Sequence, residues 1–125
     1  MGRMLKITCR SCGAGWECRT GCGMQHGNLG TVAGLYPEDI RKEIMEHAAG
    51  MEFPVYDFGY RPAHCRQCRA IVGIPVLSFG YGGTEYAGVC DRCGQAAEPA
   101  EDIAQILCPA CHEAALEKED IGLWD

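Results

Sequence analysis

Apolar residues follow a helical period most clearly between residues 35 and 50. In "LYPEDIRKEIMEHAAG" the apolar positions recur every three to five residues, as expected for one face of a helix. Pro37 suits a first helical turn, the two acidic residues after it suit the positive end of the helix dipole, and Gly50 suits the C-terminal stop. The pattern predicts a helix over about residues 37–49 that needs a surface to pack on. Its predicted apolar face consists of Leu35, Ile40, Ile44, Met45 and Ala48.

Other stretches have the composition of strands. Residues 53–60, "FPVYDFGY", are rich in aromatic and β-branched residues and predict a strand leading into Cys65. Residues 70–89 predict a hairpin with strands near 70–79 and 84–89 and a turn at Gly82 and Gly83. Pro75 predicts that the first of these strands is an edge strand or is bulged.

The remaining segments carry weaker signals. Residues 23–34 are glycine-rich and predict a loop, whereas residues 96–108 fit either a short helical turn or a strand. The C-terminal segment predicts a short strand or turn, with Leu123 and Trp124 folding back onto the core.

Cysteine is the most unusual component of this chain of 125 residues, with ten copies. They form five close pairs: Cys9/Cys12, Cys18/Cys22, Cys65/Cys68, Cys90/Cys93 and Cys108/Cys111. All but Cys18/Cys22 have the spacing Cys-x-x-Cys. The sequence has no N-terminal apolar segment of the secretory kind and no apolar run long enough for a membrane helix. We therefore expect a cytoplasmic protein, in which paired cysteines favour metal over disulfides.

A Cys-x-x-Cys knuckle is a tight turn that directs two sulfurs at one point, so two knuckles complete a tetrahedral zinc site. Four knuckles predict two sites, with zinc as the expected metal and two ions per chain. The predicted ligands are Cys9, Cys12, Cys65, Cys68, Cys90, Cys93, Cys108 and Cys111.

The residues alone leave the pairing of the knuckles open. Cys9, Cys12, Cys18 and Cys22 could form a compact site, which leaves Cys65/Cys68 over. Alternatively, Cys9/Cys12 could meet Cys65/Cys68, with the last two pairs forming the second site. A third arrangement joins Cys65/Cys68 to Cys90/Cys93 through the hairpin but leaves "CPAC" without a partner.

The order of these motifs resembles a family of small, largely uncharacterised bacterial proteins with four zinc-ribbon knuckles. The resemblance rests on "CRSC", "GCGM", a helix after Pro37, "CRQC", a hairpin, "CDRC", "EDI", "CPAC" and a closing "LWD". It implies zinc binding and a ribbon fold, and no established activity. In such proteins the positions of Cys18 and Cys22 are usually not cysteine, which favours one site of Cys9, Cys12, Cys65 and Cys68 and another of Cys90, Cys93, Cys108 and Cys111.

Iron is the alternative metal, because four thiolates also hold iron in rubredoxin-like electron carriers. "CRSCG" and "CPAC" resemble the two rubredoxin knuckles, but the chain has a long insertion, a second site and His112 where rubredoxins keep glycine.

Other reactive side chains have structural as well as functional interpretations. Cys18 and Cys22 could form a thiol switch at helical spacing, or be two small partly buried residues. His64 and His112 adjoin predicted ligands and could replace them, although a surface role is expected; His26 is expected in a loop and His47 at a helix end. Four arginines lie in or beside knuckles, where they could bind nucleic acid or offset thiolate charge: Arg10, Arg66, Arg69 and Arg92.

Charge is divided unevenly along the chain. Residues 1–69 carry nine basic and seven acidic side chains and residues 70–125 carry two and ten, which gives a formal net charge of −6. This disfavours nucleic acid and favours a protein partner. No nucleophile with partners and no open metal position is evident, so we expect no enzyme.

Together these patterns predict a small α+β protein of rubredoxin-like zinc-ribbon hairpins with one inserted helix. We expect an N-terminal ribbon over residues 1–69, carrying the helical insertion, and a hairpin with a second ribbon over residues 70–125, packed as one unit. The expected function is zinc binding in a binding or adaptor module. The alternatives are a nucleic-acid-binding ribbon and a redox-sensing or electron-transfer protein.

Overall fold

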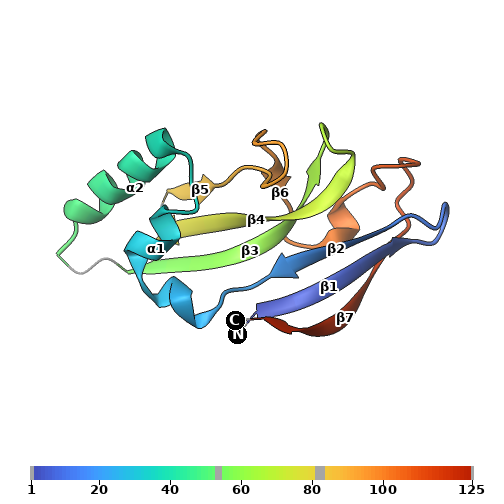
Figure 1. The fold of residues 1–125 in the computed structure, drawn as a ribbon, viewed down its shortest axis with the longest axis horizontal. Coiled ribbons are helices and arrows are strands. Elements are labelled where there is room, and N and C mark those ends of the chain that lie inside the picture. Colours follow the sequence, from blue (N-terminus) through green and yellow to red (C-terminus); the bar gives the residue numbers. More distant parts are fainter. Residues whose placement is uncertain (1, 53–54, 81–83, 125) are drawn as a thin grey trace.

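The computed structural model describes residues 2–52, 55–80 and 84–124. In these residues two antiparallel sheets lie beside each other, with α1 and α2 at one end of the second sheet (Figure 1). The first sheet contains β1 (Gly2–Cys9), β2 (Gly15–Thr20) and β7 (Leu116–Trp124). The second contains β3 (Tyr56–Cys65), β4 (Ala70–Phe79), β5 (Glu85–Ala87) and β6 (Glu98–Pro99). The helices are η1 (Met24–Gly27), α1 (Leu29–Ala33), α2 (Glu38–Ala49) and η2 (Ile103–Gln105).

The first sheet joins the two ends of the chain in the strand order β2-β1-β7. β1 pairs with β7 from Gly2 opposite Trp124 to Cys9 opposite Leu116, with a bulge after Met4. Figure 1 shows the start of β1 and the end of β7 side by side at the lower edge of the view. Neither β1 nor β2 is among the predicted strands, although Ile7 and Cys9 are buried at alternate positions of β1.

The second sheet has the order β5-β4-β3-β6, and β3 pairs with β4 in unbroken register. The strand at 70–79 is therefore neither an edge strand nor bulged against β3, and the prediction from Pro75 is wrong. Pro75 is tolerated because β5 ends beside it. The carbonyl of Pro75 accepts a hydrogen bond from the N–H of Gly88, which places the missing proline N–H on the same side, just beyond the paired part of β5. The turn expected at residues 82 and 83 lies outside the described residues.

The two sheets meet where β2 crosses β3 and β4. Gly21 and Tyr60 exchange two backbone hydrogen bonds, of 3.0 and 2.7 Å between N and O. At Gly73 the approach is so close that an added Cβ would collide with the carbonyl oxygen of Arg19. A side chain at Gly73 would therefore push the sheets apart.

Helix α2 confirms the helix expected at residues 37–49, with a narrower apolar face than predicted. Ile44 and Ala48 are buried and Ile40 packs against the core, whereas Leu35 and Met45 are exposed. The helix covers a core cluster that includes Phe58 and Leu77. The segment 23–34, expected as a loop, instead forms η1 and α1, with the Asn28 side chain capping α1 through the N–H of Thr31.

The C-terminal segment is longer and more regular than expected. It forms the nine-residue strand β7, and Trp124 packs against the core as predicted, but Leu123 is 57% exposed.

The predicted boundary after residue 69 falls in the turn between the paired strands β3 and β4. In the described residues, none of the helices has the length and apolarity needed to span a membrane.

Candidate metal centres

All four Cys-x-x-Cys segments adopt the same turn. In three of them the first cysteine donates its N–H to a carbonyl five residues on, and its own carbonyl accepts from the residue four positions on. The residue directly after the second cysteine has a positive φ in every case: Gly13 at 78°, Arg69 at 51°, Gly94 at 74° and His112 at 65°. This left-handed position turns the chain back, so that both sulfurs of a knuckle point to one side.

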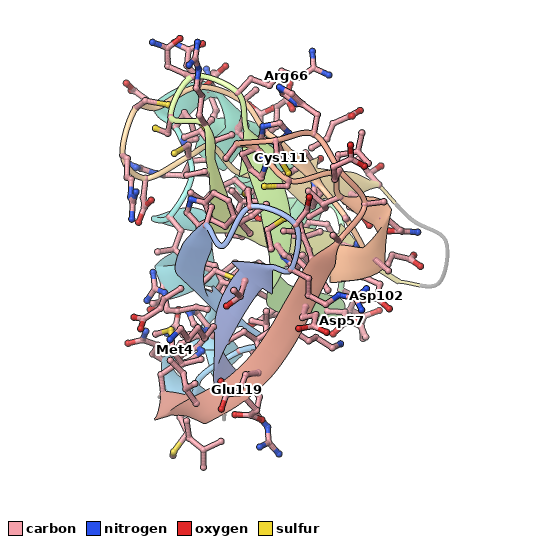
Figure 2. The ribbon with its side chains drawn as sticks, turned by 90° about the vertical axis from the view of Figure 1, so that its right-hand side faces the viewer. Met4, Asp57, Arg66, Asp102, Cys111 and Glu119 are labelled. Carbon is pink, nitrogen blue, oxygen red and sulfur yellow. The ribbon has the colours of Figure 1, made fainter. Side chains whose placement is uncertain are left out.

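The first group of four sulfurs joins the ends of the chain, and we call it the terminal site. It consists of Cys9, Cys12, Cys108 and Cys111, whose sulfurs all lie within 4.8 Å of one another. The Cys9 and Cys111 sulfurs are 3.6 Å apart, as are those of Cys12 and Cys108. In Figure 2, Cys111 lies on the loop that precedes β7.

The second group, the central site, consists of Cys65, Cys68, Cys90 and Cys93. Here the Cys65 and Cys93 sulfurs are 3.5 Å apart, and those of Cys68 and Cys90 are 3.9 Å apart. In both sites the first cysteine of one knuckle approaches the second cysteine of the other. The first cysteine of every knuckle is at most 1% exposed: Cys9, Cys65, Cys90 and Cys108.

These distances fit a tetrahedral metal site. A metal bound at about 2.3 Å by four thiolates holds its sulfurs about 3.8 Å apart. The closest contacts of 3.5–3.9 Å agree with that edge length and are far longer than the bond of about 2.05 Å in a disulfide. Two four-cysteine groups that could hold metal ions are therefore present, and they resemble zinc-ribbon sites.

The thiols of each group perturb one another. At Cys108 burial raises the pKa, but the N–H groups of Cys111 and Ala110 and the neighbouring thiols outweigh it, and the pKa falls to about 7. The pKa of Cys68 rises to about 12, chiefly through its hydrogen bond with Cys93 and then through burial. A thiol with a raised pKa keeps its proton at neutral pH. A divalent ion would displace that proton on binding, because it is the thiolate that acts as the ligand.

The pairing of the knuckles differs from the predicted pairing. Cys9/Cys12 lies with Cys108/Cys111, and Cys65/Cys68 lies with Cys90/Cys93. The reason is the long pairing of β1 with β7, which continues as the Arg10 N–H donates to the carbonyl of Ala115 and so draws the last knuckle beside the first. The central site is the arrangement that joins Cys65/Cys68 to Cys90/Cys93, and "CPAC", which that arrangement alone leaves without a partner, lies with the first knuckle.

Cys18 and Cys22 lie outside both groups, and their expected helical spacing is wrong. Cys18 is buried on β2 against Ile7 and Ile71, and burial raises its pKa to about 11. Cys22 follows the strand and is exposed. Both thiols are free.

The histidines occupy places other than metal ligands in the described residues. His112 takes the left-handed position of its knuckle, where two other knuckles have glycine. His47 stacks on Phe79 at the end of α2, with ring centroids 4.5 Å apart. His26, expected in a loop, is buried among Phe58, Tyr60 and Trp124 and accepts a hydrogen bond from the N–H of Gly23.

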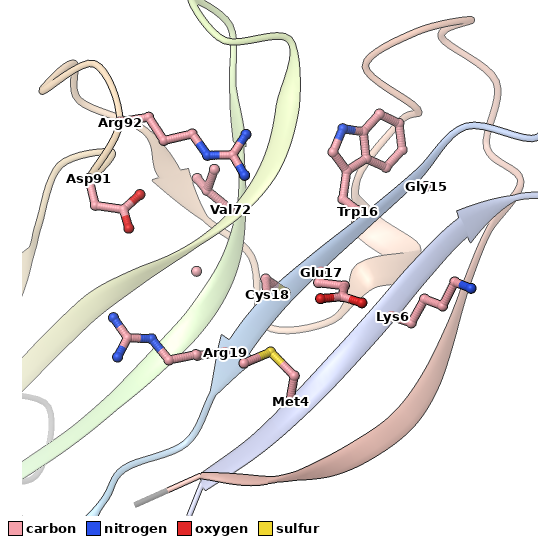
Figure 3. Close-up of a pocket in the computed structure, with 11 residues that line it drawn as sticks. Met4, Lys6, Gly15, Trp16, Glu17, Cys18, Arg19, Val72, Asp91 and Arg92 are labelled. Atoms are coloured by element: carbon pink, nitrogen blue, oxygen red, sulfur yellow. The ribbon is translucent and has the colours of Figure 1, made fainter.

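The knuckle arginines are spread over the molecule. Arg10 pairs with Glu117 at 3.2 Å, and Arg66 and Arg69 line an open cleft between the knuckles of the two sites, together with His64 and His112. Arg92 lies on another cleft, of about 760 Å³, which we call the β2 cleft. Its walls are β2 from Gly15 to Arg19 with Met4 and Lys6 beside it, Val72 and Gly73 of β4, and Asp91 with Arg92 (Figure 3).

The left-handed position after each knuckle is a feature that sequence reasoning missed. The glycines at 13 and 94 gave a signal, since glycine adopts a positive φ without steric cost. Arg69 and His112 gave no such signal, because only the three-dimensional structure of the turn shows that they occupy the position of these glycines.

The fold and the two four-cysteine groups define a small α+β protein of the metal-binding class, with seven strands and short helices in its described residues. No protein-family description, no curated protein and no solved structure matches the chain.

Proposed function

We propose that the protein binds two zinc ions, one at each four-cysteine site, and acts as a non-enzymatic binding or adaptor module. The observation that carries the proposal is the match between the sulfur distances and a tetrahedron of thiolates. Four thiolates saturate zinc and leave no position for a substrate or water, so a structural role fits better than a catalytic one.

Zinc is favoured over iron by the repeated ribbon knuckles, and a bound ion would also meet a structural need. A domain of this size has a modest hydrophobic core, and a structural zinc ion supplies an apparent free energy of about 10–16 kcal/mol in zinc-finger peptides. Each ion would supply a large part of the stability that a larger hydrophobic core would otherwise give.

A protein partner is favoured over nucleic acid by the distribution of charge. The formal net charge is −6, and two zinc ions with four thiolates each would add about −4. Of the four knuckle arginines, one is neutralised by Glu117 and the others line two different clefts. Nucleic-acid binding usually needs such cations gathered on one face.

Native mass spectrometry of the purified protein tests the metal proposal. We expect two zinc ions per chain, release of protons on loading, and loss of native structure with a chelator. One ion per chain, or a red iron-containing preparation, would contradict it. Salt-sensitive binding to DNA or RNA would replace the adaptor role with nucleic-acid binding.

A further inference from the structure

The free edge of β2 presents an unusual combination of unpaired backbone and charged walls. β2 is the outer strand of its sheet, and one side of it forms a wall of the β2 cleft. Figure 3 shows Trp16, Glu17 and Arg19 along β2, with Val72 and Arg92 on the other side of the cleft.

The register determines which backbone groups face the cleft. The Cys9 N–H donates to the carbonyl of Ala14, and the pairing with β1 continues without a shift through Trp16 and Cys18. Because bonding alternates along an antiparallel strand, the N–H and C=O groups of residues 15, 17, 19 and 21 point away from β1. Gly21 agrees with this assignment, since it bonds to Tyr60 on that side.

Two of these four residues are already covered. Gly21 is bonded to Tyr60, and the carbonyl of Arg19 packs on Gly73. The sheets then diverge, and both Gly15 and Glu17 are exposed. Within the described residues, no hydrogen bond to the outward N–H or C=O groups of Gly15 and Glu17 is found.

We infer that the β2 cleft accepts an extended peptide segment of a partner protein, which pairs with β2 at Gly15 and Glu17 as an added strand. Donors and acceptors repeated every second residue match the backbone of an extended peptide. This inference rests on the proposed adaptor function and specifies where the partner binds.

The charges of the cleft specify the peptide further. Lys6, Arg19 and Arg92 line it with only Glu17 and Asp91 opposing them, although the chain as a whole is acidic. No ion pair among these five side chains is present in the described part of the chain. A peptide with acidic side chains beside Lys6 and Arg92 would pair charges that the protein leaves unpaired.

The shape of the cleft favours one peptide over a second copy of the chain. Val72, Gly73, Asp91 and Arg92 form the wall opposite the free edge, so another sheet edge would meet this wall before it reached Glu17. A volume of about 760 Å³ lies within the usual range for pockets that hold short ligands. Nucleic acid is disfavoured because, among the described residues, Trp16 is the only aromatic side chain that lines the cleft.

The test starts with selection from a phage-displayed library of random peptides on the zinc-loaded protein. We expect acidic peptides to be enriched. A synthetic copy of an enriched peptide should bind at least about tenfold more weakly to Glu17→Pro, which lacks the N–H that faces the cleft. Glu17→Ala keeps that N–H and should stay within about threefold of the unaltered protein.

Lys118→Pro is the matched control, because Lys118 also points its backbone outward, on the opposite edge of the same sheet. It should retain full peptide binding, and all variants should retain two zinc ions. In the unaltered protein, amide hydrogen exchange at Glu17 should slow on adding peptide, while exchange at Lys118 should not change.

Absence of enriched peptides would overturn the inference, as would equal losses in Glu17→Pro and Glu17→Ala. A dimer of the protein that Glu17→Pro dissociates would assign the edge to a second copy and likewise overturn it. If the peptide binds Glu17→Pro undiminished, this inference fails while the adaptor proposal stands, because the peptide then binds elsewhere. A zinc count other than two would instead contradict the proposed metal sites.

Discussion

The terminal and central sites are built from the same knuckle but are integrated differently into the fold. Cys9 and Cys111 of the terminal site are 102 residues apart, whereas Cys65 and Cys93 of the central site are 28 apart. The central cysteines belong to a hydrophobic cluster with Val72 and Ile74, and the terminal cysteines belong to none of the core clusters of the described residues.

This difference means that a metal ion would play a different structural role at each site. Closing the longer loop of the terminal site costs about 1 kcal/mol more chain entropy on folding, so an ion bound there would have to offset a larger entropy loss. The central site instead completes a packed core. We therefore expect the two sites to stabilise different parts of the protein.

Loss of the central site should have the largest effect. Cys65→Ser with Cys68→Ser should remove one zinc ion and most tertiary structure, because polar hydroxyls replace sulfurs inside a core cluster. Native mass spectrometry and the dispersion of amide signals in NMR spectra measure both. A native spectrum in a one-zinc protein would show that this core does not need its metal.

Loss of the terminal site should be more local. Cys108→Ser with Cys111→Ser should also remove one zinc ion, but protection from hydrogen exchange should fall mainly in β1 and β7 and persist in β3 and β4. Equal loss in both sheets would remove the distinction between the sites.

Cys18→Ser with Cys22→Ser is the control for both pairs and should leave two zinc ions bound. If this variant loses an ion while Cys108→Ser with Cys111→Ser keeps both, residues 9–22 form a self-contained site and the pairing described above is wrong.

A substitution at the contact between the two sheets should have an effect of intermediate size on stability. Gly73→Ala should lower the free energy of unfolding by about 2 kcal/mol, because its Cβ would collide with the Arg19 carbonyl. Urea denaturation measures this change. Gly122→Ala is the control, since nothing lies within 4 Å of the position of its Cβ, and it should be close to neutral.

Alkaline pH tests the burial of Cys18 between the sheets. Its folded pKa of about 11 exceeds the ordinary value of 9.0, so its contribution is complete below pH 9 and is lost as the pH rises towards 11. Relative to Cys18→Ala, the unaltered protein should lose about 1–2 kcal/mol over this range. Parallel denaturation curves at each pH, with an unchanged difference between the two proteins, would contradict the assignment.

The smallest expected effects lie in the knuckles. Arg69→Gly in the central site and His112→Gly in the terminal site should each add about 0.5–1 kcal/mol of stability, because glycine adopts their positive φ without strain. Gly13→Ala and Gly94→Ala should cost about 1 kcal/mol. Thermal denaturation of the zinc-loaded proteins measures the four changes. If the substitutions to glycine destabilised the protein and the substitutions to alanine stabilised it, the four knuckles would not share the same turn.

Local chemistry was easier to predict than long-range pairing. The helix after Pro37 was predictable because its caps and apolar period lie within one segment. That the eight knuckle cysteines lie in two groups of four agrees with the spacing of the sequence, while their role as metal ligands stays a prediction. The choice of partners depended on β1 and β7, and β7 carries a run of charged residues that hides its strand character.

The pairing of the first strand with the last also has a consequence for the order of events on the ribosome. The cysteines of the central site have all been synthesised once residue 93 has emerged, whereas Cys9 and Cys12 must wait for Cys108 and Cys111. The first knuckle therefore stays without its partner until Cys111 has been made, and β1 cannot pair with β7 until residues 116–124 have emerged. The central site is therefore complete before the terminal site, and we expect metal to enter it first.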